Sequence, residues 1–246
     1  MLSRNDIKFV KSLQNKKYRK IYSAFTVEGE KNVLELLQAG WAIERLLISQ
    51  DFEMKYRAVL AQSLVKAEVI PEEQLSSLGY LESNRSALAI VSMKDDNATE
   101  VNLNASLLVL CNVQDPGNLG TIIRTADWFG IHQIVCSPVT VEWFNPKVIQ
   151  ATMGAFTRVK IYYQDLEPFL KRLEMPILAA DLRGADIYTH TFQEPSALLM
   201  GSESHGIPEE LASMISTRLT IPSFGESESL NVAIATGIFC YALRKP

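Results

Sequence analysis

Residues 115–120 form a turn with two glycines, placed between the apolar run 106–113 and a helical pattern. Glycine lets the backbone approach a ligand closely, and a helix N-terminus favours anions. The sequence lacks the GxGxxG spacing of a dinucleotide site here, and no Gly-Lys-Ser/Thr of a P-loop follows. The turn is therefore either a generic tight turn or a ligand loop of another kind. Arg124 follows it among apolar residues, and its cation either extends to solvent or points into a site that takes a negative partner.

A second polar stretch follows the apolar run at 197–200 and contains Gly201, Glu203 and His205. A carboxylate at the carboxyl end of a buried parallel strand lies where open α/β sheets bind ligands, although Glu203 could also be a simple turn carboxylate. His205 is predicted to be an exposed loop residue rather than a base. The three histidines and three cysteines show no metal-ligand spacing, so no metal site is predicted.

A third stretch, residues 221–245, ends in a predicted helix over 230–245. Ser229 or a nearby polar residue can cap this helix, which would put Asn231 in its first turn. Capping explains Ser229, but it does not explain a polar Asn231 at the head of an otherwise apolar helix. Cys240, on the same helix, is predicted to be a small core residue.

The elements that must position these stretches alternate along the second half of the chain. Strands are predicted at 106–113, 132–137, 158–163, 176–182, 197–202 and 217–222, and helices at 119–130, 147–156, 166–174 and 230–245. This alternation indicates a parallel sheet flanked by helices. Upstream, helices at 30–40 and 56–67 and strands at 42–49 and 86–93 predict a small α/β domain. We expect domains at 1–97 and 106–246, with a polar linker that extends to about residue 105.

Composition bounds the class of protein. The chain has 246 residues, a formal net charge of −4, 47% hydrophobic and 21% charged residues, as in ordinary globular proteins. Neither a signal-peptide core nor an apolar run of membrane-span length is present, so we expect a soluble protein with no membrane partner. The few scattered cysteines favour the reducing cytoplasm. The acidic balance argues against a basic nucleic-acid coat, but residues 1–20 carry seven basic residues and one acidic. That patch is either a solvated helix end or a polyanion-binding surface.

The three stretches, in this order, resemble the SpoU (TrmH-like) family of RNA ribose 2′-O-methyltransferases of the SPOUT superfamily. The resemblance rests on DPGNLGTIIRTADWFG, LLMGSESHG and IPSFGESESLNVAIA, with NPKVIQATMGAF between the first two. The N-terminal SLQNKKYRKIYSAFTVEGEKNVLELL resembles the ribosomal-protein-like substrate-binding domain of the family. Ser202, Ser223 and Ala233 differ from the residues common in the family, and none of the three replaces a catalytic group.

The resemblance implies an α/β fold in which a small ribosomal-protein-like domain precedes a parallel-sheet domain that threads a trefoil knot. It implies S-adenosylmethionine as cofactor and a homodimer through the C-terminal domain, with the RNA site between subunits. Carried over by position, the cofactor-binding residues are Leu199, Gly201, Ile221, Pro222 and Leu230, which the resemblance implies act largely through backbone groups. The cationic patch in the N-terminal domain makes Lys16, Lys17, Arg19 and Lys20 the expected RNA contacts.

The implied reaction is methylation of a ribose 2′-hydroxyl in structured RNA, most of all ribosomal RNA. A guanidinium is a poor base, so Arg124 is expected to clamp the target phosphate and stabilise the developing alkoxide. The residues expected to orient Arg124 and the ribose are Asn118, Glu203, Ser229 and Asn231. Two alternatives are a transfer-RNA ribose methyltransferase and a non-catalytic RNA-binding or ribosome-assembly protein of the same fold. The intact polar set favours an enzyme over the second alternative.

Overall fold

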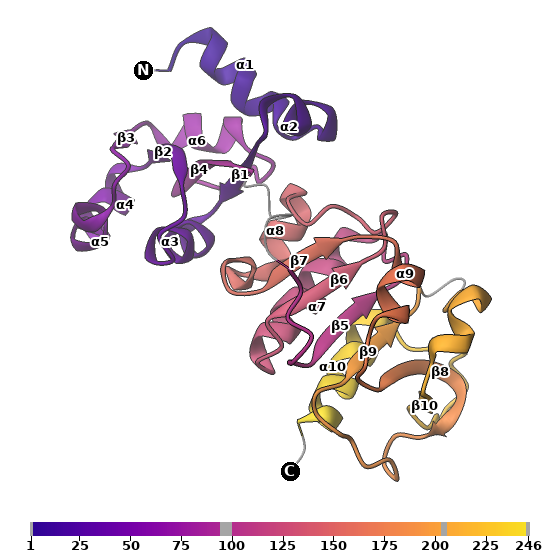
Figure 1. Cartoon of the computed structure of the whole chain (residues 1–246). Coiled ribbons are helices and arrows are strands. Elements are labelled where there is room, and N and C mark those ends of the chain that lie inside the picture. Colours follow the sequence, from indigo (N-terminus) through magenta and orange to yellow (C-terminus); the bar gives the residue numbers. More distant parts are fainter. Residues whose placement is uncertain (1, 94–99, 203–205, 245–246) are drawn as a thin grey trace. The chain divides into compact units, whose positions relative to one another are not determined.

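The computed structural model describes residues 2–93, 100–202 and 206–244 (Figure 1). The chain divides into two compact units. The N-terminal unit comprises Met1–Asp95 and Phe144–Thr157, and the C-terminal unit comprises Asp96–Trp143 and Arg158–Pro246. The end of the predicted first domain and the start of the predicted linker fall on residues 94–99, which lie outside the described residues. Within the described ranges, no helix combines the length and apolarity needed to cross a bilayer.

The N-terminal unit contains a four-stranded sheet in the order β1-β4-β2-β3. β4 pairs antiparallel with β1 and β2, and β3 pairs parallel with β2. The strands are β1 (Ala24–Glu28), β2 (Ile43–Ile48), β3 (Ala67–Val69) and β4 (Ala87–Ser92). The helices are α1 (Arg4–Ser12), α2 (Lys16–Tyr22), α3 (Glu30–Gln38), α4 (Gln50–Lys55), α5 (Arg57–Gln62) and α6 (Glu72–Leu78). The strands predicted at 42–49 and 86–93 and the helix predicted at 30–40 are confirmed.

The helix predicted over 56–67 was too long. α5 ends at Gln62, because Ser63 takes an extended conformation and its hydroxyl accepts a hydrogen bond from the Val65 N–H. A serine that bonds to nearby backbone competes with helix continuation in this way. Ala67 then begins β3.

The turn between β1 and α3 has a structural role. Glu28 is buried, and its carboxylate accepts hydrogen bonds from the backbone N–H groups of Tyr80 and Leu81 at 2.9 and 3.1 Å. Burial raises the pKa of the Glu28 carboxyl, against the effect of these bonds. A Cβ at Gly79 would lie 2.1 Å from a Glu28 carboxylate oxygen, so the contact requires glycine. Glu28 therefore ties the loop around residues 79–81 to the sheet.

Residues 144–157 pack with the N-terminal unit, although they follow the predicted boundary in sequence. They form α8 (Pro146–Thr152) and the short 3-10 helix Ala155–Thr157. Phe144 lies 6.1 Å from Phe25 between ring centroids, and Phe156 lies 5.7 Å from Trp41. Phe156 is thus a buried core residue, and α8 packs against β1.

The C-terminal unit contains six parallel strands in the order β10-β8-β9-β5-β6-β7. They are β5 (Leu107–Leu110), β6 (Gln133–Cys136), β7 (Lys160–Tyr163), β8 (Ile177–Asp186), β9 (Ala197–Met200) and β10 (Thr217–Thr220). The helices are α7 (Pro116–Trp128), α9 (Leu166–Lys171) and α10 (Val232–Leu243), with a 3-10 helix at Glu209–Met214. The predicted parallel sheet flanked by helices is confirmed.

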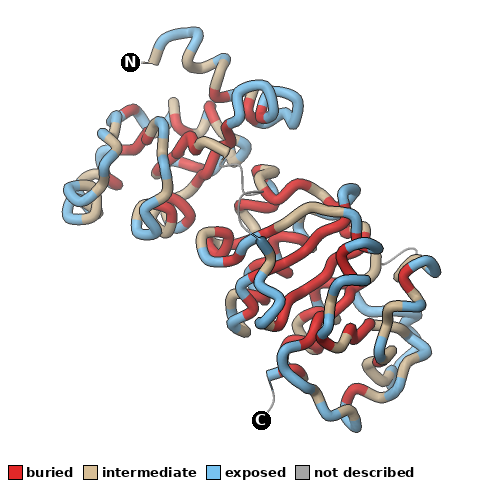
Figure 2. The backbone as a smooth tube through the Cα atoms, in the orientation of Figure 1, coloured by how far each residue is buried: buried red, intermediate tan, exposed pale blue. Residues whose placement is uncertain are grey.

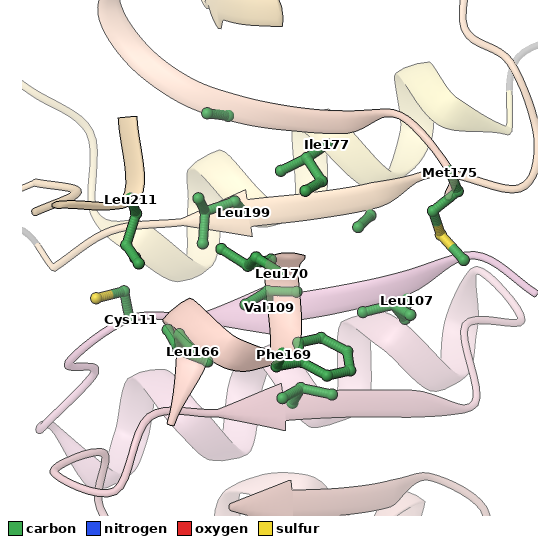
Figure 3. Close-up of a cluster of buried hydrophobic side chains, with 13 residues drawn as sticks. Leu107, Val109, Cys111, Leu166, Phe169, Leu170, Met175, Ile177, Leu199 and Leu211 are labelled. Carbon is green, nitrogen blue, oxygen red and sulfur yellow. The ribbon is translucent and has the colours of Figure 1, made fainter. Parts of the chain in front are cut away.

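Helices cover both faces of this sheet, so its central strands are buried (Figure 2). On one face, Leu166, Phe169 and Leu170 of α9 pack over Val109 and Leu199 of the sheet (Figure 3). Side chains alternate along a strand, so the intervening residues of β5 and β9 face the opposite side. There α10 packs against both α7 and β9.

The carboxyl ends of parallel strands meet at one edge of a sheet. The segments that follow β5, β9 and β10 are the three polar stretches of the sequence. β9 is the hydrogen-bonded neighbour of β5, and the Cys111 N–H donates to the Met200 carbonyl just beyond their paired residues. The fold therefore brings the polar stretches to one edge of the C-terminal unit.

Candidate active site

Asparagine and aspartate side chains cap the two helices that begin at this edge. Asp115 caps α7, where its carboxylate accepts from the Asn118 N–H at 2.8 Å. Asn231 caps α10, where its side-chain oxygen accepts from the N–H groups of Ala233 and Ile234 at 3.0 and 3.3 Å. The prediction that put Asn231 in the first turn, after a cap at Ser229, was therefore wrong. Ser229 is exposed in the segment before the cap.

The two caps are joined by a side-chain bridge. The Asn231 Nδ2 donates a hydrogen bond of 2.9 Å to the Asn118 Oδ1, across a sequence separation of 113 residues. The bridge explains why a polar residue heads the apolar helix α10. Since helix N-termini carry a partial positive charge, the joined ends of α7 and α10 suit a ligand with negative or developing negative charge.

Replacement of Asn231 can separate the cap from the bridge. Asn231→Ala removes both, and we expect a loss of about 1 kcal/mol of stability, seen as a Tm lower by about 2–4 °C. Asn231→Ser keeps a good cap but is too short to reach Asn118, so its Tm should stay close to wild type. We expect both variants to lose methylation of RNA, measured beside the thermal melts. Full activity in Asn231→Ser would show that the bridge lies outside the site.

The loop that carries Asp115 is fixed by residues that sequence reasoning missed. Asn112 has a φ of +60°, a conformation that asparagine tolerates better than most residues. Its N–H donates to the Ser137 hydroxyl at 2.9 Å, and that hydroxyl donates to the Asn112 Oδ1 at 3.0 Å. The Val141 N–H also donates to the Val113 carbonyl. The end of β6 therefore positions the α7 cap.

Arg124 lies on an exposed strip of α7. It is six residues beyond Asn118, or about 9 Å along the helix axis at 1.5 Å per residue. Across the residues that the structure describes, no carboxylate forms an ion pair with Arg124. Its guanidinium is thus available to an anion, although no contact joins it to the Asn118–Asn231 bridge of the same chain. Trp128, one helical turn further on, is exposed on the same side.

The turn after β9 requires glycine at its start. A Cβ at Gly201 would lie 2.3 Å from the backbone of Gly206, and Ser202 and Gly206 exchange two backbone hydrogen bonds. The predicted site residue Glu203 and the loop residue His205 lie outside the described residues.

The expected cofactor residues divide into two groups. The side chain of Leu199 is fully buried in the core beneath α9, so the predicted contact of Leu199 with the cofactor is left to its backbone (Figure 3). Gly201, Ile221 and Pro222 are partly accessible, and Leu230 is exposed. They follow β9 and β10, the strands on either side of β8. Exposed and partly accessible apolar side chains fit an adenosine and a thioether, so this part of the edge suits S-adenosylmethionine.

The expected RNA contacts include one correction. Lys16, Lys17 and Lys20 are exposed on α2. Arg19 is only 2% exposed, and its Nη1 donates to the carbonyls of Leu13 and Gln14, both at 2.8 Å. Arg19 therefore holds the turn between α1 and α2, and a buried guanidinium cannot serve as a surface contact to RNA.

The cysteines are structural. Cys240 is fully buried on α10, as predicted, and burial raises the pKa of its thiol to about 12. Burial also raises the pKa of Cys111 to about 11. Such thiols stay protonated and are inert as nucleophiles. Among the described residues, no group of three His, Cys, Asp or Glu is placed to hold a metal ion.

A parallel sheet with bridged helix caps at its carboxyl edge, together with a small second unit, makes this an α/β protein of two compact units with a site suited to an anionic ligand. The particular family is given by comparison with known proteins. The sequence model of the SpoU rRNA Methylase family matches residues 105–241, and that of the MRM3-like substrate binding domain matches residues 4–89. The chain belongs to the SpoU rRNA methylase family, which confirms the resemblance inferred from the three stretches.

Similar proteins match over nearly the whole chain. The 23S rRNA (guanosine(2553)-2′-O)-methyltransferase RlmP of Bacillus subtilis is 28% identical over 97% of this chain and 95% of its own. A structure of a putative TrmH-family RNA methyltransferase from Porphyromonas gingivalis has a TM-score of 0.86 and 36% identity, and the match covers 99% of this chain and 98% of that one. An AdoMet-bound rRNA methyltransferase from Sinorhizobium meliloti has a TM-score of 0.87 and 30% identity, with 99% and 95% covered. The expected fold class is thereby confirmed, while the roles of individual residues stay predictions.

Proposed function

We propose that this chain methylates the 2′-hydroxyl of a ribose in ribosomal RNA, with S-adenosylmethionine as the methyl donor. The observation that carries the proposal is the Asn118–Asn231 bridge between two helix N-termini, in a chain of the SpoU family. The similar RlmP is named as a 2′-O-methyltransferase of 23S rRNA. The AdoMet-bound relative from Sinorhizobium meliloti supports the same methyl donor here.

S-adenosylmethionine, when bound, supplies an electrophilic methyl group. Gly201, Ile221, Pro222 and Leu230 would hold it, with backbone groups for its polar atoms and apolar side chains for its adenosine. The demands on the remaining residues are orientation of the ribose and stabilisation of the oxygen as its proton leaves.

Arg124, Asn118 and Asn231 meet these demands. Arg124 clamps the phosphate next to the target ribose and stabilises the developing alkoxide, because a guanidinium forms two charge-assisted bonds in a fixed geometry. Asn118 and Asn231 orient the ribose hydroxyl at the joined helix N-termini. Glu203 and Ser229 complete the proposed polar site by their positions in the family motifs.

An exposed apolar surface supports the homodimer. α10 contains no charged residue. On it Ile234 is 55% and Tyr241 63% exposed, and Trp128 of the neighbouring α7 is 84% exposed. Large exposed apolar groups on packed helices indicate an interface. Because Arg124 shares the exposed side of α7 with Trp128, a second copy there would put Arg124 between subunits, where the RNA site is expected.

The sheet order supports the trefoil knot. The chain leaves the edge strand β10 and returns in α10 to pack against α7, which follows the interior strand β5. Such a return across other strands is unusual for an open sheet. A ribosomal RNA substrate also places the protein in the cytoplasm.

Mapping of ribose methylation tests the function, since a 2′-O-methyl group blocks alkaline cleavage of the next phosphodiester bond. Total RNA from cells that lack this protein, incubated with the purified chain and S-adenosylmethionine, should gain one block in ribosomal RNA. A block in transfer RNA alone would favour the transfer-RNA enzyme. No block and no heat of S-adenosylmethionine binding by calorimetry would favour the non-catalytic RNA-binding protein.

A further inference from the structure

Two tyrosines form a stacked pair on the surface of the N-terminal unit. Tyr18 and Tyr22 are 38% and 47% exposed, and their rings lie 6.3 Å apart with an interplanar angle of 17°. Phe9 of α1 packs edge-on against Tyr22 at 5.0 Å and 87°, which fixes the inner ring. Ile21, also exposed, lies on the same helical face. The side of α2 that carries Tyr18 and Tyr22 is therefore an aromatic surface held in place by Phe9.

A cation lies beside this pair. Lys17 is exposed on the same short helix, and its ammonium lies 6.0 Å from the centre of the Tyr18 ring. Asp6, the one acidic residue among the first 20, is held by Ser3 and Arg45, at 2.9 and 2.7 Å. Among the described residues no carboxylate forms an ion pair with Lys17, so its positive charge stays beside the Tyr18 ring. This charge is complementary to a polyanion rather than to an apolar protein surface.

Flat exposed rings next to a cation are complementary to an unpaired base of RNA and its phosphate. Bases within a duplex already stack on their neighbours, so a protein ring cannot reach their faces. Unpaired bases in loops and bulges have a free face, and they stack on aromatic side chains while lysines contact the adjacent phosphates. Cations alone would bind paired and unpaired RNA alike.

We propose that Tyr18 and Tyr22 form a stacking platform for an unpaired base of the substrate RNA, with Lys17 on a flanking phosphate. The proposal rests on the proposed function and deepens it. The substrate presents a loop or bulge to the N-terminal unit, and the platform recognises that the base is unpaired rather than which base it is.

The test measures binding of the full chain to three labelled RNAs by fluorescence anisotropy. The first is a hairpin with a loop of adenosines, the second is the same hairpin with abasic riboses in the loop, and the third is a blunt duplex with the same number of phosphates. The test variant is Tyr18→Ala/Tyr22→Ala. Tyr18→Phe/Tyr22→Phe keeps the rings, and Tyr80→Ala is a matched control, because Tyr80 is 42% exposed in the same unit.

We expect the double alanine variant to bind the adenosine loop about tenfold more weakly, or ~1.4 kcal/mol. Its affinity for the abasic hairpin and the duplex should change less than twofold, and the phenylalanine variant should match wild type. Equal losses on all three RNAs, or no loss on the adenosine loop, would overturn the proposal. A melting temperature equal to that of wild type checks the fold. The binding assay needs no methyl transfer. Failure of the proposed activity would instead be seen in the mapping of ribose methylation, so the two failures can be distinguished.

Discussion

Arg124→Ala should lower the rate of RNA methylation by about 10²–10³-fold, the usual cost of removing one group that stabilises developing charge. The affinity for S-adenosylmethionine should stay within a few-fold, because the cofactor residues follow β9 and β10 whereas Arg124 lies on α7. Arg124 is exposed and has no carboxylate partner in the described part of the chain, so its loss should leave the Tm unchanged. Single-turnover methylation and calorimetric titration measure the two effects.

Two further variants separate charge from geometry. Arg124→Lys keeps the charge but loses the planar pair of donors, and we expect only partial activity. Arg172→Ala is a matched control, since Arg172 is an exposed arginine at the end of α9 on the other face of the sheet. It should methylate as wild type does. A loss of cofactor affinity as large as the loss of rate in Arg124→Ala would contradict the assigned role.

Ile234→Asp should convert the proposed dimer into monomers and remove activity with it. Ile234 lies in the first turn of α10, where a carboxylate is favourable for the helix, so the fold should tolerate the change. In an apolar interface the same charge would be desolvated without a partner. We therefore expect the dissociation constant of the dimer to rise by about 100-fold or more. Sedimentation velocity over a range of concentrations measures the change. Leu64→Asp is the control, because Leu64 is fully exposed in the N-terminal unit.

The dimer also predicts complementation between inactive variants. A mixture of Arg124→Ala and Asn231→Ser chains should recover about a quarter of wild-type activity if each Arg124 serves the partner's site, since half of the dimers are then mixed with one complete site. No recovery in mixed dimers would show that Arg124 acts within its own chain. A wild-type protein that stays monomeric would contradict both expectations.

The sequence alone was enough to predict the structural features that depend on local residue patterns. Buried strands such as β5 and β9 are continuous apolar runs, and the turns that follow them carry their glycines and capping groups, so the parallel sheet and the position of its polar edge were predictable. The identity of the α10 cap was not predictable, because Ser229 and Asn231 are both good caps. Only the contact with Asn118 distinguishes them, and the two residues of that contact are 113 residues apart in the sequence.

Tertiary contacts explain the remaining differences. Arg19 has the same sequence context as the lysines around it, and its burial follows from the carbonyls that the α1–α2 turn leaves without partners. Asn112 and Ser137 come from the ends of two different strands, and no local spacing relates them.

Because Phe144–Thr157 folds with the residues before Asp95, the two units do not correspond to two consecutive pieces of the chain. A protease cut near residues 94–99 would leave Phe144–Thr157, a part of the N-terminal unit, on the C-terminal fragment, so we expect the cleaved halves to stay associated until denatured. In a chimera whose N-terminal unit comes from a relative, the segment that corresponds to α8 would have to come from the same relative. Recombination at a single crossover would otherwise leave Phe144 and Phe156 without the aromatic partners that bury them.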